Sequence, residues 1–261
     1  MDLILNADDF GVSEETVRAT IECFEQGALT SATIMAGMPA AESALKFASQ
    51  HPERSFGVHL TFVTDGIEHP LADPASIPDL LGADGRFLPT ATVRQRAVLH
   101  RLPVKQIEKE LEAQLAFVRD HGVPISHVDS HRHVHKLAPF RAALRNVLPR
   151  FGLGRVRNVQ DVYLRRSPRG ATFWLGPLWR RQLMRHFMTT DHFYMPRPGE
   201  NRWHAGLLAL TAGLRGSLEV GVHPGYDETR DPERRSVQEL ADGARANGHR
   251  LISWNDLRSF R

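Results

Sequence analysis

Residues 127–135, with the sequence HVDSHRHVH, contain four histidines and one aspartate. In a β-strand, side chains alternate between two faces, so His127, Asp129 and His131 would share one face, with the alternation fading near His133. Burying such a face is costly unless its groups are paired or bind a metal ion. Two imidazoles and a carboxylate are a common ligand set for Zn²⁺ and for other divalent transition metals. We therefore interpret this segment as part of a metal site, in which the surplus groups would fix the tautomers of the ligands.

Other acidic and imidazole side chains follow apolar runs elsewhere in the chain. Asp8 and Asp9 follow the first run, His59 ends the third, and His223 closes a late one. Each also has an ordinary interpretation: an acidic helix N-terminus for the aspartates, a core or surface histidine for His59, and a Pro-Gly turn around His223. Their shared position at the carboxyl ends of predicted strands favours a joint role, because those ends converge on one face of a β/α barrel.

Short apolar, β-rich runs alternate with longer helical patterns along the whole chain. Ser13 can cap the first helix and Gly27 can end it. The predicted strands cover residues 3–6, 31–37, 56–63, 125–131, 155–159, 192–195, 217–226 and 251–257. The predicted helices cover residues 13–27, 40–51, 104–122, 138–148, 173–188, 203–214 and 236–248, and residues 65–88 are expected to form a long loop.

This order of elements predicts a parallel sheet with helical crossovers. Seven or eight β-then-α units in 261 residues fit a closed or nearly closed β/α barrel best, as one domain over residues 1–261. A doubly wound open sheet is the alternative. No Gly-rich phosphate loop follows any of the predicted strands, which argues against the nucleotide-binding form of that alternative.

The composition is that of a globular protein, with 41% hydrophobic and 24% charged residues. The net charge of +3 is small, acidic and basic residues are mixed, and no nucleic-acid-binding signature is present. Cys23 is the single cysteine, which excludes an internal disulfide. The first apolar run is followed directly by acids, so it predicts a strand rather than a signal peptide, and no apolar run is long enough to span a membrane. These features predict a cytoplasmic protein.

Five short motifs are spread along the chain. They are NADDFG at residues 6–11, TSATIM at 30–35, GVHL at 57–60, HVDSHRHVH at 127–135 and EVGVHPGY at 219–226. Together they resemble the YdjC-like carbohydrate deacetylases, the family that contains the chitooligosaccharide deacetylases, in order from residue 3 to about residue 257. A related branch that acts in hopanoid biosynthesis has NAHKHFH at the histidine cluster, so DSHRHVH places this chain nearer the chitooligosaccharide branch. Residues 165–215 match no part of the family pattern and could hold the substrate specificity.

The resemblance implies a distorted TIM-like β/α barrel that binds one divalent metal ion, Mg²⁺ or Zn²⁺. It also implies hydrolysis of an N-acetyl group from an amino sugar or oligosaccharide. Asp9, His59 and His131 match the positions of the family's metal ligands, and Asp8 matches the position of the catalytic base. His223 is our candidate for the acid that protonates the leaving amine.

Several further side chains would lie around such a site. Those expected to hold the ligands in place or to contact substrate are His127, Asp129, His133 and Glu219. Those expected at the surface or behind the ligands are His121, His135 and His204. Trp174, Trp179 and Tyr194 could stack on sugar faces, or could belong to the core or to an oligomer contact. An N-acetylated sugar is the expected partner, and apolar residues between 170 and 215 could form a homodimer contact.

Two other classes of protein compete with this interpretation. A metal-dependent phosphoesterase would favour two metal ions with Arg132 or Lys136 near the cluster, and other amidohydrolases on this kind of barrel usually begin with a His-x-His pair on the first strand. A metal-storage or sugar-binding protein would leave Asp8 without a role. Release of acetate against release of phosphate would separate the two enzyme classes.

Overall fold

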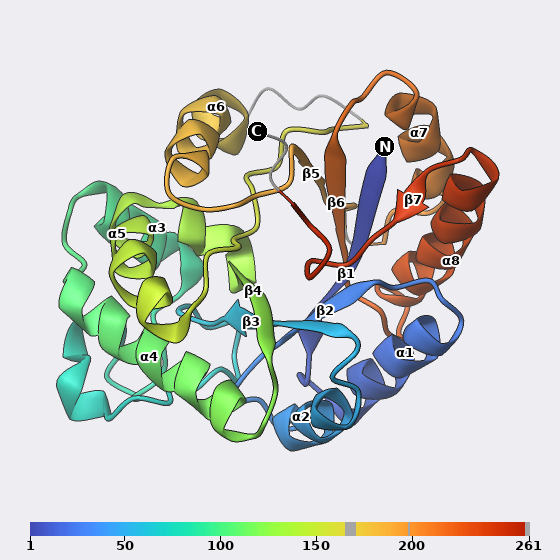
Figure 1. Cartoon of the computed structure of the whole chain (residues 1–261). Helices are drawn as coiled ribbons and strands as arrows, with labels where there is room; N and C mark the ends of the chain where they lie inside the picture. The colour runs from blue at the N-terminus through green and yellow to red at the C-terminus, as the bar shows by residue number, and fades with distance from the viewer. Residues whose placement is uncertain (165–170, 198, 259–261) are drawn as a thin grey trace.

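The computed structural model describes residues 1–164, 171–197 and 199–258, and its strands and helices alternate along the chain (Figure 1). The strands are β1 (Asp2–Phe10), β2 (Ser31–Ile34), β3 (Ser55–Leu60), β4 (Ile125–Ser130), β5 (His192–Tyr194), β6 (Ser217–Val222) and β7 (Arg250–Leu251). The α-helices are α1 (Glu14–Glu25), α2 (Ala41–Gln50), α3 (Thr90–Val98), α4 (Val104–Asp120), α5 (Ala138–Val147), α6 (Ala171–Met184), α7 (Trp203–Thr211) and α8 (Asp231–Ala246). Short 3₁₀-helices are η1 (Pro74–Ser76), η2 (Pro78–Leu80), η3 (His131–Lys136) and η4 (Leu148–Phe151).

The strands form a parallel seven-stranded sheet in the order β4-β3-β2-β1-β6-β5, with β7 also paired to β1. Residues 154–161 lie between β4 and β5, the strands at the two ends of that order. Arg157 donates its N–H to the Val128 carbonyl of β4 at 3.0 Å, and Asp161 donates to the Phe193 carbonyl of β5 at 3.2 Å. The ring of strands therefore curls round on itself, and the predicted distorted β/α barrel is confirmed.

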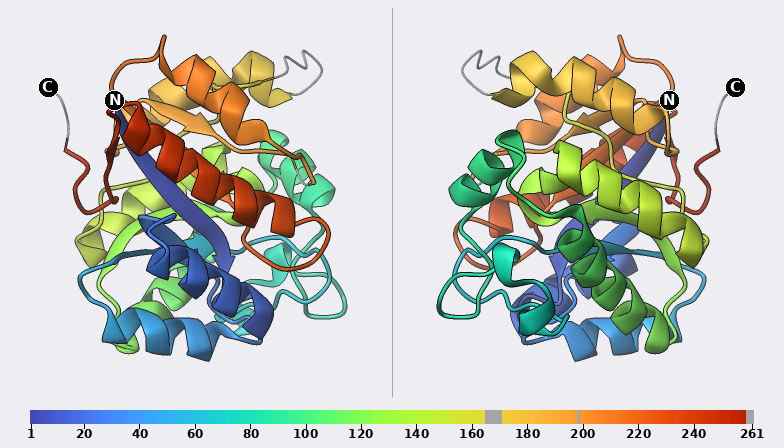
Figure 2. Two further views of the ribbon diagram at one scale, coloured as in Figure 1. Left: turned by 90° about the vertical axis from the view of Figure 1, so that its right-hand side faces the viewer. Right: turned by 90° about the vertical axis from the view of Figure 1, so that its left-hand side faces the viewer.

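Helices surround this ring on its outside. Figure 2 shows α1 and α8 on one side of the molecule, with α3, α4 and α5 on the opposite side. Ser13 caps α1 as predicted, because its side chain accepts the Thr16 N–H at 3.2 Å while the Thr16 hydroxyl accepts the Ser13 N–H at 3.1 Å. Among the described helices, none is both long enough and apolar enough to cross a membrane.

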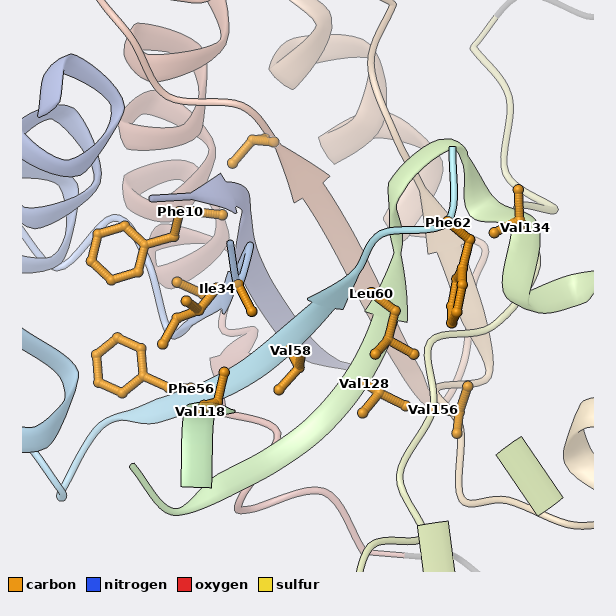
Figure 3. Close-up of a cluster of buried hydrophobic side chains, with 14 of the residues drawn as sticks. Phe10, Ile34, Phe56, Val58, Leu60, Phe62, Val118, Val128, Val134 and Val156 are labelled. Carbon is orange, nitrogen blue, oxygen red and sulfur yellow. The ribbon is translucent and has the colours of Figure 1, made fainter. Parts of the chain in front are cut away.

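Side chains alternate between the two faces of each strand, with apolar residues on the outer face and polar residues toward the interior. The outward-facing residues join the helices in one large hydrophobic core; Figure 3 shows a part that includes Phe10, Ile34, Phe56, Val58, Leu60 and Val128. The buried polar residues that alternate with them are Asn6, Asp8, Thr33, His59, His127, Asp129 and Glu219. Burying so many polar groups is tolerated only when they hydrogen-bond or bind ions, so the interior of the ring is where a functional site is expected.

Strand β1 runs on to Phe10, so that Asp8 and Asp9 lie within it rather than after it, and α8 begins five residues earlier than predicted, at Asp231. Three other differences have a clear physical reason. Residues 155–159 form isolated bridges, such as Val128 with Val156, rather than a regular strand. The last strand shortens to Arg250–Leu251 because residues 254–256 form a turn that carries the buried Trp254 into the interior. Helix α3 was not predicted, since TATVRQRAV has few apolar residues to give a helical period.

Candidate active site

Three predicted residues from distant parts of the chain meet at one edge of the sheet. Asp9 lies near the end of β1, His59 lies near the end of β3, and His131 directly follows β4. Oδ1 of Asp9 is 3.5 Å from Nε2 of His59 and 3.5 Å from Nδ1 of His131. The three ligand atoms lie within 4.8 Å of one another, a spacing that could hold a metal ion.

Oδ1 of Asp9 is buried, yet it has no hydrogen-bond partner among the described residues. Burial acts to raise the pKa of Asp9, but the His131 ring 3.5 Å away and the charges of His223 and His59 hold that pKa well below its usual range. The carboxylate is therefore ionised and faces two imidazole nitrogens. A buried anionic oxygen with imidazoles beside it and no donor of its own fits a divalent cation, and two nitrogens with one oxygen suit a transition metal such as Zn²⁺.

Each of the two histidines is oriented by its own carboxylate, which bonds the imidazole nitrogen that faces away from Asp9. Nδ1 of His59 donates to Oδ1 of Asp129 at 2.8 Å, and Thr33 donates to the other oxygen of Asp129 at 3.1 Å. Nε2 of His131 donates to Oδ2 of Asp65 at 2.8 Å. In the neutral form of each ring, this leaves the nitrogen that faces Asp9 with its lone pair, which is the tautomer that a metal ligand needs.

The pKa of His131 follows from the same contacts. Burial acts to lower it, but the hydrogen bond to Asp65 and the nearby Asp9 carboxylate outweigh burial and raise it to about 9. In the absence of a cation the ring therefore takes up a proton, which pairs with the Asp9 carboxylate. A cation at this place would have to displace that proton, so metal binding at this site is expected to compete with protonation.

The backbone beside the site is strained. Asp9, Arg132 and His133 have φ values of 59°, 55° and 54°, in the left-handed region that residues other than glycine seldom adopt. The pairing of β1 with β2 also shifts register between Ala7 and Phe10. In a regular strand Asp8 and Asp9 would point to opposite faces, and this distortion allows both carboxylates to serve the same site.

A buried arginine lies beneath the three candidate ligands. Arg157 donates to both oxygens of Asp8, at 2.5 and 2.6 Å, and also pairs with Asp129 at 2.7 Å and Glu219 at 2.8 Å. Burial acts to raise the pKa of Asp8, but the Arg157 charge and hydrogen bonds lower it to about 2. Burial dominates at Glu219 and raises its pKa to about 7 despite the same arginine. Arg157 thus holds Asp8 ionised throughout the neutral range.

His223 directly follows β6 and lines the same cleft as Asp9 and His131. Oε2 of Glu233 accepts the backbone N–H of His223 at 2.7 Å and its Nδ1–H at 3.1 Å. Burial acts to lower the pKa of His223, but the Glu233 charge and hydrogen bond raise it to about 9. His223 is therefore an imidazolium at neutral pH, with its ring held through Nδ1.

The opening above these groups is a cleft of about 420 Å³. Its lining includes Asp9, Met35, Met38, His131, His223 and Arg230. The two methionines give it an apolar wall beside the charged residues. A cleft that combines a few convergent polar groups with apolar surface is the usual form of a small-molecule site.

The other predicted residues lie around the cluster or away from it. His127 is buried inside the ring, where it stacks on Trp254 at 4.5 Å between ring centroids. His133 and His135 line a separate cavity of about 180 Å³ with Arg94 and Lys136. The side chain of Arg132 is half exposed and pairs with Asp65 at 2.5 Å, so it points outward.

Several predicted histidines and aromatic residues are not part of the cleft. His121 is exposed and bonds to the Phe117 carbonyl, and His204 pairs with Glu239. Tyr194 is buried in the core. Trp179 lies under Lys136, with Nζ 5.4 Å from its ring centroid, and the ring of Trp174 is largely exposed on α6. The predictions for residues 165–170 lie outside the described residues.

Three site residues were missed at the level of sequence. Arg157 occupies an inward position in the segment predicted as a strand, and an arginine at that position could have signalled a buried ion pair. Glu233 lies in the first turn of α8, where an acid is expected for the helix dipole alone. Arg230 directly precedes α8 and carries no pattern that separates it from a surface arginine.

Comparisons with known proteins show which proteins this chain is similar to. The family model described as YdjC-like protein matches residues 2–259. The chain is 32% identical over 228 residues to a protein named carbohydrate deacetylase from Halalkalibacterium halodurans, and the match covers 87% of this chain and 86% of the relative. It is 42% identical over 133 residues to a protein of the same name from Geobacillus stearothermophilus, but that match spans only 51% of this chain and 50% of the relative.

A solved structure supports the fold alone. It belongs to a protein from Enterococcus faecalis that is named for a suggested role in cellobiose-phosphate cleavage. The TM-score is 0.79 with 21% identity, and the match covers 99% of both chains.

Replacing Arg157 with methionine should destabilise the protein strongly. The Arg157→Met change keeps most of the side-chain volume but leaves Asp8, Asp129 and Glu219 buried without their shared cation, which typically costs about 3–5 kcal/mol. Chemical denaturation followed by circular dichroism would measure the loss. Arg150→Met is the matched control, because Arg150 pairs with Glu112 at the surface, where such pairs contribute less than about 1 kcal/mol. Equal stability of the two variants would contradict the account of the buried network.

Proposed function

This chain belongs to the YdjC-like protein family, and on that premise we propose that it is a metal-dependent hydrolase that removes an N-acetyl group from an N-acetylated amino sugar or oligosaccharide. A chitooligosaccharide-like substrate is the specific form of the proposal. The observation that carries the metal-dependent reaction is the buried Oδ1 of Asp9, which faces the imidazoles of His59 and His131 and has no hydrogen-bond partner among the described residues. The name carbohydrate deacetylase, shared by the relatives, supports the type of reaction.

Asp8 would act as the general base on the attacking water. Its carboxylate is ionised because of Arg157, but with a pKa of about 2 it is a weak base. A divalent cation held by Asp9, His59 and His131, either Zn²⁺ or Mg²⁺, would polarise the acetyl carbonyl and lower the pKa of water from ~15.7, to about 7 in favourable Zn²⁺ sites and less far with Mg²⁺. This would narrow the gap between the pKa of the water and that of Asp8. Arg157 would keep Asp8 in place while one carboxylate oxygen of Asp8 receives the proton from the water.

His223 would act as the general acid on the leaving amine. Since Glu233 holds Nδ1, the Nε2–H is the proton that the imidazolium can give to the amine nitrogen as the amide bond breaks. The Met35 and Met38 wall of the cleft would exclude water from the acetyl methyl group. Four residues would act behind the reacting groups by fixing their positions: His127, Asp129, His133 and Glu219.

Three further expectations stay predictions: a single domain over residues 1–261, a cytoplasmic location and a homodimer.

Acetate release is the direct test of this function. Purified protein, treated with chelator and then given Zn²⁺ or Mg²⁺, should release acetate from N-acetylglucosamine oligomers only after metal is restored. Asp8→Asn should still bind metal yet lose about 10²–10⁴-fold in turnover. His131→Ala should lose both the metal and the activity.

His121→Ala is the matched control, because His121 is exposed and lies outside the cleft. Release of phosphate from phosphoesters without release of acetate would instead favour the phosphoesterase class. Unchanged metal content and activity in His131→Ala would show that the ligand assignment is wrong.

The pH dependence of the reaction should report on His223. The acid must be protonated to donate, and its pKa is raised to about 9, so kcat/KM should hold through neutral pH and fall as the pH rises through about 9. Glu233→Gln removes the charge that raises this pKa, so the alkaline fall should move to lower pH.

Glu239→Gln, which affects an exposed carboxylate paired with His204, should leave the pH profile unchanged. If the alkaline limb stayed in place in Glu233→Gln, His223 would not be the acid.

A further inference from the structure

Arg230 lines the same cleft as Asp9 and contacts this candidate metal ligand directly. Its Nη2 donates to Oδ2 of Asp9 at 2.7 Å, across 221 positions of sequence. Arg230 also lines the cleft and lies on the same β6–α8 loop as His223. The contact brings a positive charge next to the proposed cation site, where a positive charge would be unfavourable unless it had a specific use.

The position of Arg230 is built into the loop. Oδ1 of Asp227 accepts the backbone N–H groups of Thr229 at 2.8 Å and Arg230 at 3.0 Å, which fixes the turn before α8. The aliphatic stem of Arg230 packs on Gly225, where an added Cβ would come within 2.7 Å of the Arg230 Cβ. The guanidinium is therefore directed at Asp9 by both a backbone turn and a close packing contact.

The two oxygens of Asp9 are divided between different partners. Oδ2 is taken by Arg230, whereas Oδ1 faces His59 and His131 and has no hydrogen-bond partner within the described part of the chain. A carboxylate free of Arg230 could offer both oxygens to a cation, as carboxylate ligands often do. We propose that Arg230 is a positioning residue that restricts Asp9 to one oxygen toward the cation and so keeps coordination positions open for water and the acyl oxygen.

This inference rests on the proposed function, because it assumes a cation between Asp9, His59 and His131. Catalytic metal sites differ from structural ones in keeping an open position for water or substrate. A ligand that bound through both oxygens would occupy one of those positions. Arg230 therefore explains how a site with a carboxylate ligand can stay open, in the way that outer partners of metal ligands commonly tune a site.

The test replaces Arg230 with methionine in the whole protein and uses Co²⁺ as the probe. The visible absorption of bound Co²⁺ weakens as its coordination number rises. In Arg230→Met we expect weaker absorption than in the wild type, Co²⁺ affinity that is equal or higher, and kcat at saturating Co²⁺ that is about 10–100-fold lower. Gly225→Ala keeps the charge but displaces the arginine stem, so it should produce the same spectral change.

Arg234→Met is the matched control. Arg234 lies on α8 but pairs with Glu22 and Asp231, away from the cleft, so its loss should leave the Co²⁺ spectrum and kcat unchanged. Gly225→Ala serves as the second variant should Arg230→Met fail to fold.

The outcomes separate this inference from the proposed function. Weaker Co²⁺ binding in Arg230→Met with an unchanged spectrum and unchanged kcat at saturation would overturn the inference, because Arg230 would then only support the structure. A wild-type protein that bound no Co²⁺ would overturn both the cation site and the inference. The predicted spectral change in a protein that released no acetate would uphold the role of Arg230 and refute the deacetylase function.

Discussion

The pairing of Arg157 with Asp8, Asp129 and Glu219 inside the ring of strands is the interaction on which the rest of the site depends. Each of these side chains is buried, so none could stay charged without the others. The segment that carries Arg157 also bridges β4, and that hydrogen bonding closes the ring. The closure of the fold and the ionisation of the site are therefore achieved by the same few residues.

This arrangement leaves negative charge directed toward the cleft. Arg157 supplies one positive charge for the three carboxyl groups of Asp8, Asp129 and Glu219, and burial raises the pKa of Glu219 to about 7. Asp9 stands above them with only one oxygen paired to Arg230. A divalent cation between Asp9, His59 and His131 would balance this charge, and the strained backbone at Asp9 and His133 is the kind of conformation that a packed scaffold maintains at functional sites.

Much of the fold and of the ligand cluster could be predicted because both rest on strong local signals. Alternating apolar runs marked the strands, and the acids and histidines at their carboxyl ends marked one face of a barrel. The motifs that contain Asp8, His59 and His131 then indicated which residue would be the catalytic base and which would be metal ligands.

The supporting residues could not be predicted in the same way. Arg157 lies in a segment whose pairing is too irregular to form a strand, and its partners lie 28 to 149 positions away in the sequence. Glu233 and Arg230 sit beside a helix start, where charged residues are common for local reasons. Their roles depend on tertiary contacts that a local pattern does not show: Arg230 donates to Asp9 of β1, and Glu233 accepts from His223 after β6.

Anomalous diffraction from crystals soaked in Co²⁺ would locate a cation directly. We predict one strong peak enclosed by Oδ1 of Asp9, Nε2 of His59 and Nδ1 of His131. A peak elsewhere, for example beside Asp65 and Glu68, with none among those atoms would contradict it.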